Sequence, residues 1–438
     1  MTSALGEGSV DRQKHYPRIP EVAVGRVSAL DSTNRARHRW YFVKEAFSPD
    51  IVTTAINDAK CEDHDIVVDP FCGSGTVPLQ AAIHGRQSRC IEVNPFLAFV
   101  ARTKLSQCRP QSLKSHAEKV LKRATHPRRS PLEGYSTFSK TRGISKWLFN
   151  TSVLRAFESG YAELSARSAQ SDLLKLCLIG AAMDNANAVK DGKCLRYRSD
   201  WDERHFDAES FRNSFESRVK MIVQDLEEVP LNQRPSCITR GDARKKRFRM
   251  PGTQGFKLCL TSPPYLNSFD YTDVYRPELF LGRWVTTRDG LRRMRQHTLR
   301  SHVQAEWKDP TADDFGPLYA ASIEELRAKQ ASLWNQRIPL MVQAYFEDMR
   351  KVLTSLRKQA APDGSVWLVV STSAYAGIEI PVDLIIADVA GSCGWFLQDV
   401  SVLRYLDRVA GQQWKQLVDR NDDGPHLRES LVVLSTTR

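Results

Sequence analysis

Apolar and polar positions along the first hundred residues predict strands and helices in alternation. Residues 65–69 form a short apolar run of strand length, and 77–84 form an apolar helix that ends before Gly85. A second apolar strand over 89–93 precedes a helix whose first turn contains Pro95 and which reaches about residue 105. Strands that alternate with helices predict a parallel sheet with helices on both faces.

The pattern changes over residues 106–235, which are polar, basic and mostly helical in periodicity. One apolar helix face is formed by Phe211, Phe215, Val219 and Ile222. Apolar strands return at 237–239 and 256–260. These shifts predict a flexible N-terminal arm over 1–30, an α/β domain over 31–105 and 236–438, and a helical insertion over 106–235.

The last third of the chain again has α/β character. A polar, arginine-rich stretch over 268–317 is followed by long helical periodicity to residue 358. Ala361-Pro-Asp-Gly364 predicts a turn that precedes a strand over 365–371. A helix over 381–389 and two closing strands near residues 400 and 432 complete the expected sheet.

Composition and charge narrow the class of protein. The 438 residues carry 63 Lys+Arg against 51 Asp+Glu, a formal net charge of +12, which favours a polyanionic partner. A hydrophobic fraction of 41% suffices for a packed core, and no apolar run has the length of a membrane span. Nine cysteines without a CxxC pair, and the absence of a signal-peptide pattern, predict a cytoplasmic protein, and the ten histidines form no HExxH motif, so we expect no metal.

Asp69-Pro-Phe-Cys-Gly-Ser-Gly-Thr76 is the first motif that predicts chemistry. Its two glycines let the backbone turn sharply out of a strand and approach a ligand closely. No Lys-Ser/Thr pair follows the second glycine, so the motif is not a P-loop. Glu92 ends the next strand, where an acid can accept hydrogen bonds from ribose hydroxyls. We interpret Cys72 as a small residue of the turn and not as a nucleophile.

The second motif, Thr261-Ser-Pro-Pro-Tyr265, directly follows an apolar strand. Two successive prolines fix the backbone and lack amide donors, which leaves the local carbonyls as acceptors. Ser262 adds a side-chain acceptor and Tyr265 a flat ring for stacking. Acceptors beside an aromatic platform suit a planar substrate that presents an amino group.

Together these motifs resemble the S-adenosylmethionine (SAM)-dependent DNA amino-methyltransferases, in particular those that make N4-methylcytosine. Serine at position 262 is typical of the N4-cytosine enzymes, whereas Asp or Asn is more usual in N6-adenine enzymes. The resemblance also includes 40–49, Gly241-Asp-Ala243 and the residues that continue the second motif, and covers 38–105 and 236–438. It implies a Rossmann-like sheet, SAM as cofactor, double-stranded DNA as partner, and direct in-line transfer after base flipping.

The resemblance assigns roles to individual residues. The implied catalytic residues are Ser262, Pro263, Pro264 and Tyr265. The implied cofactor-binding residues are Lys44, Phe47, Asp69, Pro70, Phe71, Gly73, Ser74, Gly75, Thr76, Glu92, Val93, Asn94, Asp242, Ala243 and Thr261. A cognate restriction or defence nuclease is a further expected partner, and the protein is expected to associate with the nucleoid when bound to DNA.

Basic clusters are the candidates for phosphate contacts. The best are Arg244, Lys245, Lys246 and Arg247, and Arg292, Arg293 and Arg295 in a run that reaches Arg300; Lys190 to Arg198 is a third cluster. The insertion and the 268–317 stretch compete as the region that reads the target, and the size of the insertion favours it.

Several alternatives remain open at the level of sequence. The Gly-rich turn precedes the Ser-Pro-Pro-Tyr motif here, the reverse of the order in many N4-cytosine enzymes, so N6-adenine methylation is an alternative. An RNA amino-methyltransferase and a catalytically silent SAM-binding subunit are others. No proline precedes a cysteine, which disfavours methylation at cytosine C5.

Overall fold

The chain divides into two compact units whose parts alternate along the sequence. The computed structural model describes residues 29–164, 168–191, 194–231, 236–252, 254–406 and 427–438. The N-terminal unit comprises Ser28–Arg249 and Asp270–Thr298, and the C-terminal unit comprises Met250–Phe269 and Leu299–Arg438. The predicted arm over 1–30 lies outside the described residues except for its last two positions, which begin the 3-10 helix η1 (Ala29–Thr33).

The N-terminal unit contains the predicted strand–helix repeats. Its three parallel strands are β1 (Ile66–Asp69), β2 (Gln87–Glu92) and β5 (Ser236–Arg240), with β2 in the middle. Its first helices are η2 (His38–Trp40), α2 (Pro49–Asp58), α3 (Thr76–Ile83) and α4 (Pro95–Lys104). Every residue of β1 is buried, as expected for a strand covered on both faces. The predicted strands and helices of this region are confirmed.

Local signals mark the start of α2, which was not predicted, and of α4, which was. Ser48 caps α2 by accepting from the backbone N–H of Asp50, and Pro49 occupies its first turn. The Asn94 side chain likewise accepts from the backbone N–H groups of Phe96 and Leu97 at the start of α4. The N-terminus of each helix is therefore satisfied within the turn that leads into it.

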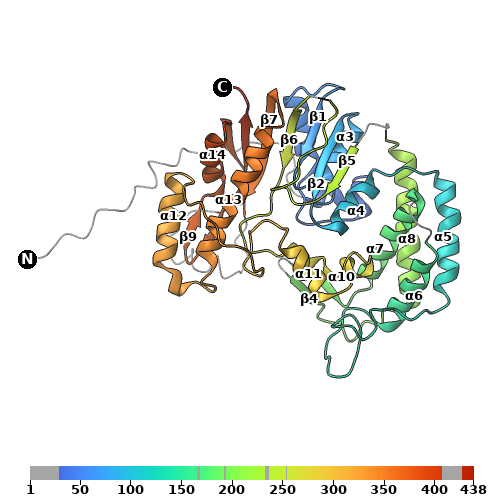
Figure 1. Cartoon of the computed structure of the whole chain (residues 1–438). Helices are drawn as coiled ribbons and strands as arrows, with labels where there is room; N and C mark the ends of the chain where they lie inside the picture. The colour runs from blue at the N-terminus through green and yellow to red at the C-terminus, as the bar shows by residue number, and fades with distance from the viewer. Residues whose placement is uncertain (1–28, 165–167, 192–193, 232–235, 253, 407–426) are drawn as a thin grey trace, which may run out of the picture. The chain divides into compact units, whose positions relative to one another are not determined.

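The insertion is mainly helical, as predicted. Its helices are α5 (Pro110–Ala124), α6 (Thr151–Ala162), α7 (Ala169–Asp184) and α8 (Ala208–Glu228), which pack against one another (Figure 1). The predicted apolar face of α8 is buried, with Phe211 and Phe215 at its centre. A short antiparallel hairpin, β3 (Ala188–Asp191) and β4 (Cys194–Tyr197), was not predicted.

Residues 270–298 contribute three short helices to the same unit as the insertion. They are α9 (Tyr271–Val274), α10 (Arg276–Leu281) and α11 (Arg288–Arg295). Lys175 of α7 donates to the Gly282 carbonyl at 2.9 Å, and its ammonium lies 4.2 Å from the Trp284 ring centroid. Arg283 pairs with the buried Glu158 of α6 at 2.5 Å. Residues 270–298, which are part of the 268–317 stretch, therefore belong to the same compact unit as the insertion.

The C-terminal unit contains four strands of a mixed sheet. They are β6 (Phe256–Thr261), β7 (Ala360–Ser371), β10 (Phe396–Tyr405) and β11 (Arg428–Ser435). β6 and β7 are parallel, β11 is antiparallel to β7, and β10 is antiparallel to β11. The remaining elements are α12 (Pro317–Ala328), η3 (Gln330–Ser332), α13 (Ile338–Arg357), α14 (Val382–Ser392) and the hairpin β8 (Ser373–Tyr375) and β9 (Ile378–Ile380).

The prediction of a turn over 361–364 is wrong. β7 begins at Ala360, and its register with β6 shifts between the pairs Phe256↔Ala360 and Leu258↔Ser365. The extra residues on β7 form an irregularity within the strand, where Thr436 donates to the Gly364 carbonyl through its backbone N–H at 3.0 Å. Residues typical of a turn therefore form a bulge-like irregularity within β7.

Within the described part of the chain, none of the helices has the length and apolar character needed to cross a membrane.

Candidate functional site

The Gly-rich turn is tied to the end of β2 through Glu92. One oxygen of this carboxyl group accepts from the Gly73 backbone N–H and the other from the Asn94 backbone N–H, each at 2.7 Å. The buried Asp69 at the end of β1 accepts from the Phe71 backbone N–H at 2.8 Å. The carboxyl ends of two adjacent parallel strands thus hold the turn between them, which is where α/β folds bind ligands.

Glu92 is an acid in an unusual environment. Burial raises the pKa of Glu92 from 4.5 to about 7, against the opposing effect of its backbone hydrogen bonds. The group therefore changes protonation near neutral pH, and any ligand that donates hydrogen bonds to it would favour the ionised form.

Glycine is required at position 75 by a close approach between helices. Gly75 has a φ of +85°, and a Cβ atom there would lie 2.7 Å from the Cβ atom of Ala101 in α4. Gly73 has a φ of +52° but more space around it. The second glycine of the motif therefore lets α3 begin directly against α4, and the first supplies the left-handed backbone that aims its N–H at Glu92.

The cysteine in the turn has a structural environment. Cys72 packs with Cys90, Ala98, Ala101 and Ile238 in a buried cluster. Its side-chain hydrogen bond with Cys90 and burial raise the pKa of Cys72 well above its usual value. A buried thiol held in the neutral form is not a nucleophile, in agreement with the sequence interpretation.

Asp242, the predicted partner of the adenine amino group, is bound to a neighbour that was predicted to contact phosphate. Arg244 donates to Asp242 Oδ1 through Nε at 2.9 Å and to Oδ2 through Nη2 at 2.8 Å. Both side chains are largely buried. Arg244 thus orients the carboxylate that follows β5.

The other predicted cofactor residues divide between the two units. All of the predicted cofactor-binding residues except Thr261 belong to the N-terminal unit. They are Lys44, Phe47, Asp69, Pro70, Phe71, Gly73, Ser74, Gly75, Thr76, Glu92, Val93, Asn94, Asp242 and Ala243. Lys44 is exposed, whereas Phe47 is buried. Thr261 is buried at the end of β6, in the C-terminal unit with the Ser-Pro-Pro-Tyr motif.

The Ser-Pro-Pro-Tyr loop is anchored at its far end. The Leu266 carbonyl accepts from the Tyr375 hydroxyl at 2.8 Å and from the Ser373 hydroxyl, both in β8. Ser262 Oγ, in contrast, makes no hydrogen bond to any described residue and is only partly buried. The loop is therefore fixed by β8 while the hydroxyl oxygen of Ser262 remains available to a ligand.

Tyr265 has a partner that sequence reasoning did not identify. Its hydroxyl donates to Glu429, a buried residue of β11, and Arg404 of β10 donates to the second oxygen of Glu429 at 2.7 Å. Three strands of the C-terminal unit, β6, β11 and β10, thus place the ring. A pairing across more than 160 positions leaves no local signal in the sequence.

The basic residues predicted to contact phosphate differ in their availability. Arg244 is bound to Asp242, and Arg295 is bound to Asp270 at 2.6 Å. Exposed side chains without an ion pair in the described residues are those of Lys245, Lys246, Arg247, Arg292 and Arg293. These five remain predictions as nucleic-acid contacts.

Two further basic residues of the broader clusters named from the sequence are engaged in ion pairs within the chain. Arg300 is buried and pairs with Asp348 at 2.6 Å. Lys190 of β3 pairs with the fully buried Glu278 of α10, which also accepts from the Tyr41 hydroxyl at 2.6 Å. Burial of a charge is tolerated only with a partner, and these partners come from distant segments of the sequence.

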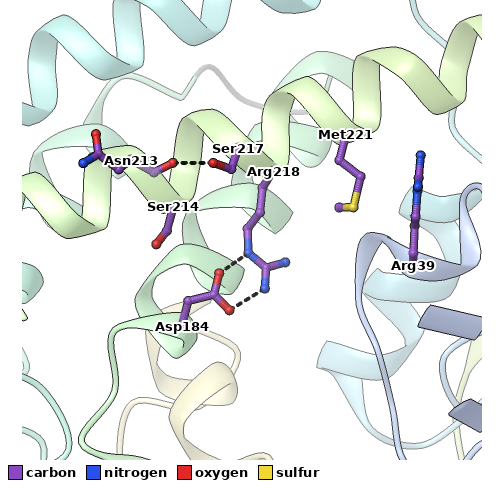
Figure 2. Close-up of a pocket in the computed structure, with 7 residues that line it drawn as sticks. All are labelled: Arg39, Asp184, Asn213, Ser214, Ser217, Arg218 and Met221. Carbon is purple, nitrogen blue, oxygen red and sulfur yellow. Dashed lines mark hydrogen bonds and ion pairs between the residues drawn. The ribbon is translucent and has the colours of Figure 1, made fainter. Parts of the chain in front are cut away.

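A pocket of about 470 Å³ in the N-terminal unit lies apart from the predicted site residues. Figure 2 shows it over α8, with the Arg218 guanidinium facing the Asp184 carboxylate. The two hydrogen bonds from Arg218 to Asp184 measure 2.6 and 2.7 Å. Its second arginine, Arg39, is bound to Asp225, so the charges of this pocket are neutralised by residues of the chain itself.

Among the described residues, no group of three His, Cys, Asp or Glu side chains is arranged to hold a metal ion.

Comparisons with known proteins agree with the fold and the motifs. Residues 37–135 match the family described as RMKL-like, methyltransferase domain. The Type II methyltransferase M.AvaI of Nostoc sp. is 24% identical over 408 residues, 86% of this chain and 83% of that protein. The Type II methyltransferase M.BsoBI of Geobacillus stearothermophilus is 25% identical over 436 residues, 88% and 84% of the two chains.

A solved structure also aligns over most of the chain. The rRNA methyltransferase aviRa of Streptomyces viridochromogenes covers 95% of both chains at 11% identity, but its TM-score of 0.33 is too low to support a conclusion.

The family match over 37–135 includes β1, the Gly-rich turn and Glu92, so the methyltransferase similarity falls on the part of the chain in which the turn and its acid lie. Over most of its length, the chain is a relative of the Type II methyltransferases M.AvaI and M.BsoBI.

Proposed function

We propose that the protein is a site-specific DNA methyltransferase that uses SAM to methylate the exocyclic N4 amino group of cytosine. The observation that carries this proposal is the Ser262-Pro-Pro-Tyr265 loop, fixed at Leu266 by β8, with the Ser262 hydroxyl oxygen unoccupied by any described residue. The relationship to Type II methyltransferases supports DNA as the substrate.

The residues around the Gly-rich turn fit SAM. Asn94 Nδ2 is a buried donor that has no hydrogen-bond partner among the described residues, which indicates that a ligand supplies its acceptor. Glu92 and Asp242 provide carboxylate acceptors suited to ribose hydroxyls and to an adenine amino group. When bound, SAM supplies an electrophilic methyl group on a sulfonium.

The second motif is suited to hold the acceptor base. Ser262 Oγ and the Pro263 carbonyl would accept hydrogen bonds from the two amino hydrogens of cytosine, which leaves the nitrogen lone pair directed away from them. Tyr265 would stack on the flipped base, while the Tyr265 hydroxyl donates a hydrogen bond to Glu429. An amino nitrogen that gains a methyl group must lose one proton, which Ser262 Oγ would accept and pass to solvent. Catalysis by this arrangement rests mainly on positioning the amino group for in-line transfer.

The charge distribution supports a nucleic-acid substrate. Exposed Lys245, Lys246 and Arg247 follow Asp242, and Arg292 and Arg293 lie on α11. Contacts of this kind to phosphate supply affinity independent of sequence. A cognate nuclease remains a prediction from the resemblance.

Transfer of labelled methyl groups from SAM to plasmid DNA and to total RNA tests the substrate class. We expect label in DNA alone. As a check on the role of the second motif, Ser262→Ala should lower kcat about 100-fold or more while SAM affinity changes less than about threefold. Label in RNA alone, or equal loss of SAM binding in this variant, would contradict the proposal.

A further inference from the structure

A second pocket of the N-terminal unit is lined by arginines. It measures about 270 Å³, and its cationic wall consists of Arg276 from α10 and Arg288, Arg292 and Arg295 from α11. Two acidic residues, Asp273 and Asp289, also line it. The basic side chains therefore exceed the acidic ones by two, before any outside partner is counted.

Several of these cations have no counter-charge. Arg276 forms no ion pair or hydrogen bond with any described residue, and its Nε atom is buried without a partner. Arg288 and Arg292 are exposed and likewise lack an ion pair in the described part of the chain. Arg295 is the exception, since it is bound to Asp270. A buried guanidinium nitrogen without an acceptor indicates that one arrives from outside.

The spacing of the pocket arginines along α11 places their side chains on one face of the helix. Positions 288, 292 and 295 follow the i, i+4, i+7 pattern of a single helix face, and all three residues line the pocket. Leu291 and Met294 are the buried residues of α11, and Leu291 also lines the pocket, whereas Arg293 does not. Like charges at this spacing repel one another, and an anion bound between them would relieve that repulsion.

The volume of the pocket limits the size of the ligand that it can bind. Sites for whole cofactors and drug-sized ligands usually measure about 300–1,000 Å³, somewhat more than this one. A phosphate with its adjoining sugar is small enough to enter. Arginine is the side chain best matched to phosphate, because its planar donors can engage two oxygens at once.

Both regions that compete as target readers build this pocket. Tyr135 and Phe138 come from the insertion, and their rings pack on Phe280 of α10 at centroid distances of 5.4 and 5.2 Å. The arginines come from residues 276–295. The aromatic contact thus holds a loop of the insertion beside the charged face of α11.

We propose that this arginine pocket binds a backbone phosphate of the DNA substrate, and that the loop of the insertion with Tyr135 and Phe138 forms one DNA-binding surface together with residues 270–298. The proposal rests on the proposed function for the identity of the nucleic acid. It assigns direct phosphate contacts to Arg276, Arg288 and Arg292, and a supporting role to Arg295. Contacts of this kind position the protein on DNA and are independent of sequence.

The test measures the salt dependence of DNA binding. The probe is a fluorescein-labelled DNA duplex of arbitrary sequence, titrated with the full-length protein over a series of KCl concentrations and followed by anisotropy. For Arg276→Ala/Arg292→Ala, we expect the slope of log Kd against log[KCl] to fall by about 0.9, since the pocket neutralises one phosphate and each neutralised phosphate contributes about 0.9. Affinity at low salt should weaken at least about tenfold.

Controls separate this result from a general loss of charge or of folding. Arg123→Ala removes one exposed, unpaired arginine of α5 outside the pocket and should leave the slope unchanged. Arg288→Ala removes a third arginine of the pocket and should lower the slope by no more than about 0.9. SAM affinity of each variant, measured by calorimetry, reports whether the fold is intact.

The outcomes distinguish the two proposals. If the wild-type protein methylates DNA but the double variant keeps the wild-type slope, the pocket inference is wrong and the proposed function stands. If the wild-type protein methylates RNA and binds the DNA duplex without salt dependence, the proposed function fails, and the pocket inference fails with it. A slope reduced equally by Arg123→Ala would also overturn the pocket assignment.

Discussion

Arg244 binds the Asp242 carboxylate with two nitrogens, at 2.9 and 2.8 Å, directly after β5. Two residues that were predicted to serve different ligands therefore serve one another. Asp242 is left with a fixed orientation, and Arg244 has donors already in use. In the basic run that follows β5, Lys245 is therefore the first side chain that remains a predicted phosphate contact.

The first prediction follows from this pair. Arg244→Ala should weaken SAM binding about tenfold, because the variant leaves the largely buried Asp242 without the charge-assisted hydrogen bonds that orient it. The salt slope of DNA binding should stay at the wild-type value. Calorimetry with SAM and anisotropy with a DNA duplex measure the two effects.

Lys245→Ala is the matched control, since it removes an exposed neighbouring charge. It should give the opposite pattern, with normal SAM affinity and a reduced salt slope. An unchanged SAM affinity in Arg244→Ala would show that Asp242 has no part in cofactor binding.

The second prediction concerns pH. Burial raises the pKa of Glu92 to about 7, from an ordinary value of 4.5, and ribose hydroxyls that donate to the carboxylate favour its ionised form. SAM affinity should therefore increase as pH rises, by up to about tenfold per unit below pH 7, and level off above it. Calorimetric titration across this range measures the dependence.

Glu92→Gln removes the titrating group and should bind SAM weakly with no such pH dependence. In the free protein the sign is reversed, because the raised pKa favours the protonated folded state: the contribution of Glu92 to stability is present below about pH 4.5 and is lost as pH rises through 7. A SAM affinity that is flat from about pH 6 to 8 in the wild-type protein would contradict the role of Glu92.

The third prediction concerns Glu429, which we propose as a positioning residue for Tyr265. Glu429→Ala should lower kcat about tenfold or more, because the ring loses the acceptor that fixes its hydroxyl. SAM affinity should not change. Glu429→Gln keeps an acceptor oxygen and should restore most of the activity.

Arg404→Ala controls for the loss of charge balance, since Arg404 donates to the same carboxylate from a half-exposed position. Its effect on kcat should be small. If the glutamine and alanine variants were equally impaired, the hydrogen bond to Tyr265 would not be the cause.

The fourth prediction compares two glycines in left-handed backbone. Gly75→Ala should lower the free energy of unfolding by about 3 kcal/mol or more, since the strained φ is joined by a Cβ contact of 2.7 Å with Ala101. Gly85→Ala carries only the strained φ, with no atom within 4 Å of the new Cβ, and should cost about 1 kcal/mol. Denaturant unfolding measures both values, and equal costs would exclude the close helix approach at Gly75.

Local signals explain why the cofactor region could be predicted from the sequence. The strand over 65–69, the glycines of the turn and Pro95 at the start of α4 each act within a few residues, and the structure has β1, the turn and α4 at these places. Asn94 caps α4 for the same reason. The α/β class follows from this alternation, because a strand and the helix after it have different periods.

Long-range pairings explain what could not be predicted. The β3–β4 hairpin lies in a polar, basic segment, and one of its contacts is the ion pair of Lys190 with the buried Glu278, far along the chain. Counting charges by sign also treats Arg244 and Arg300 as surface cations, although each has an acidic partner. The partner of a charge is a property of the fold, and the sequence pattern does not contain it.

Mass spectrometry of nucleosides tests the central claim most directly. Plasmid DNA grown in a host without DNA methyltransferases is treated with the purified protein and SAM, digested to nucleosides, and analysed. The proposed function predicts N4-methylcytosine in the wild-type sample and its loss in Ser262→Ala. N6-methyladenine or 5-methylcytosine as the product, with no N4-methylcytosine, would contradict it.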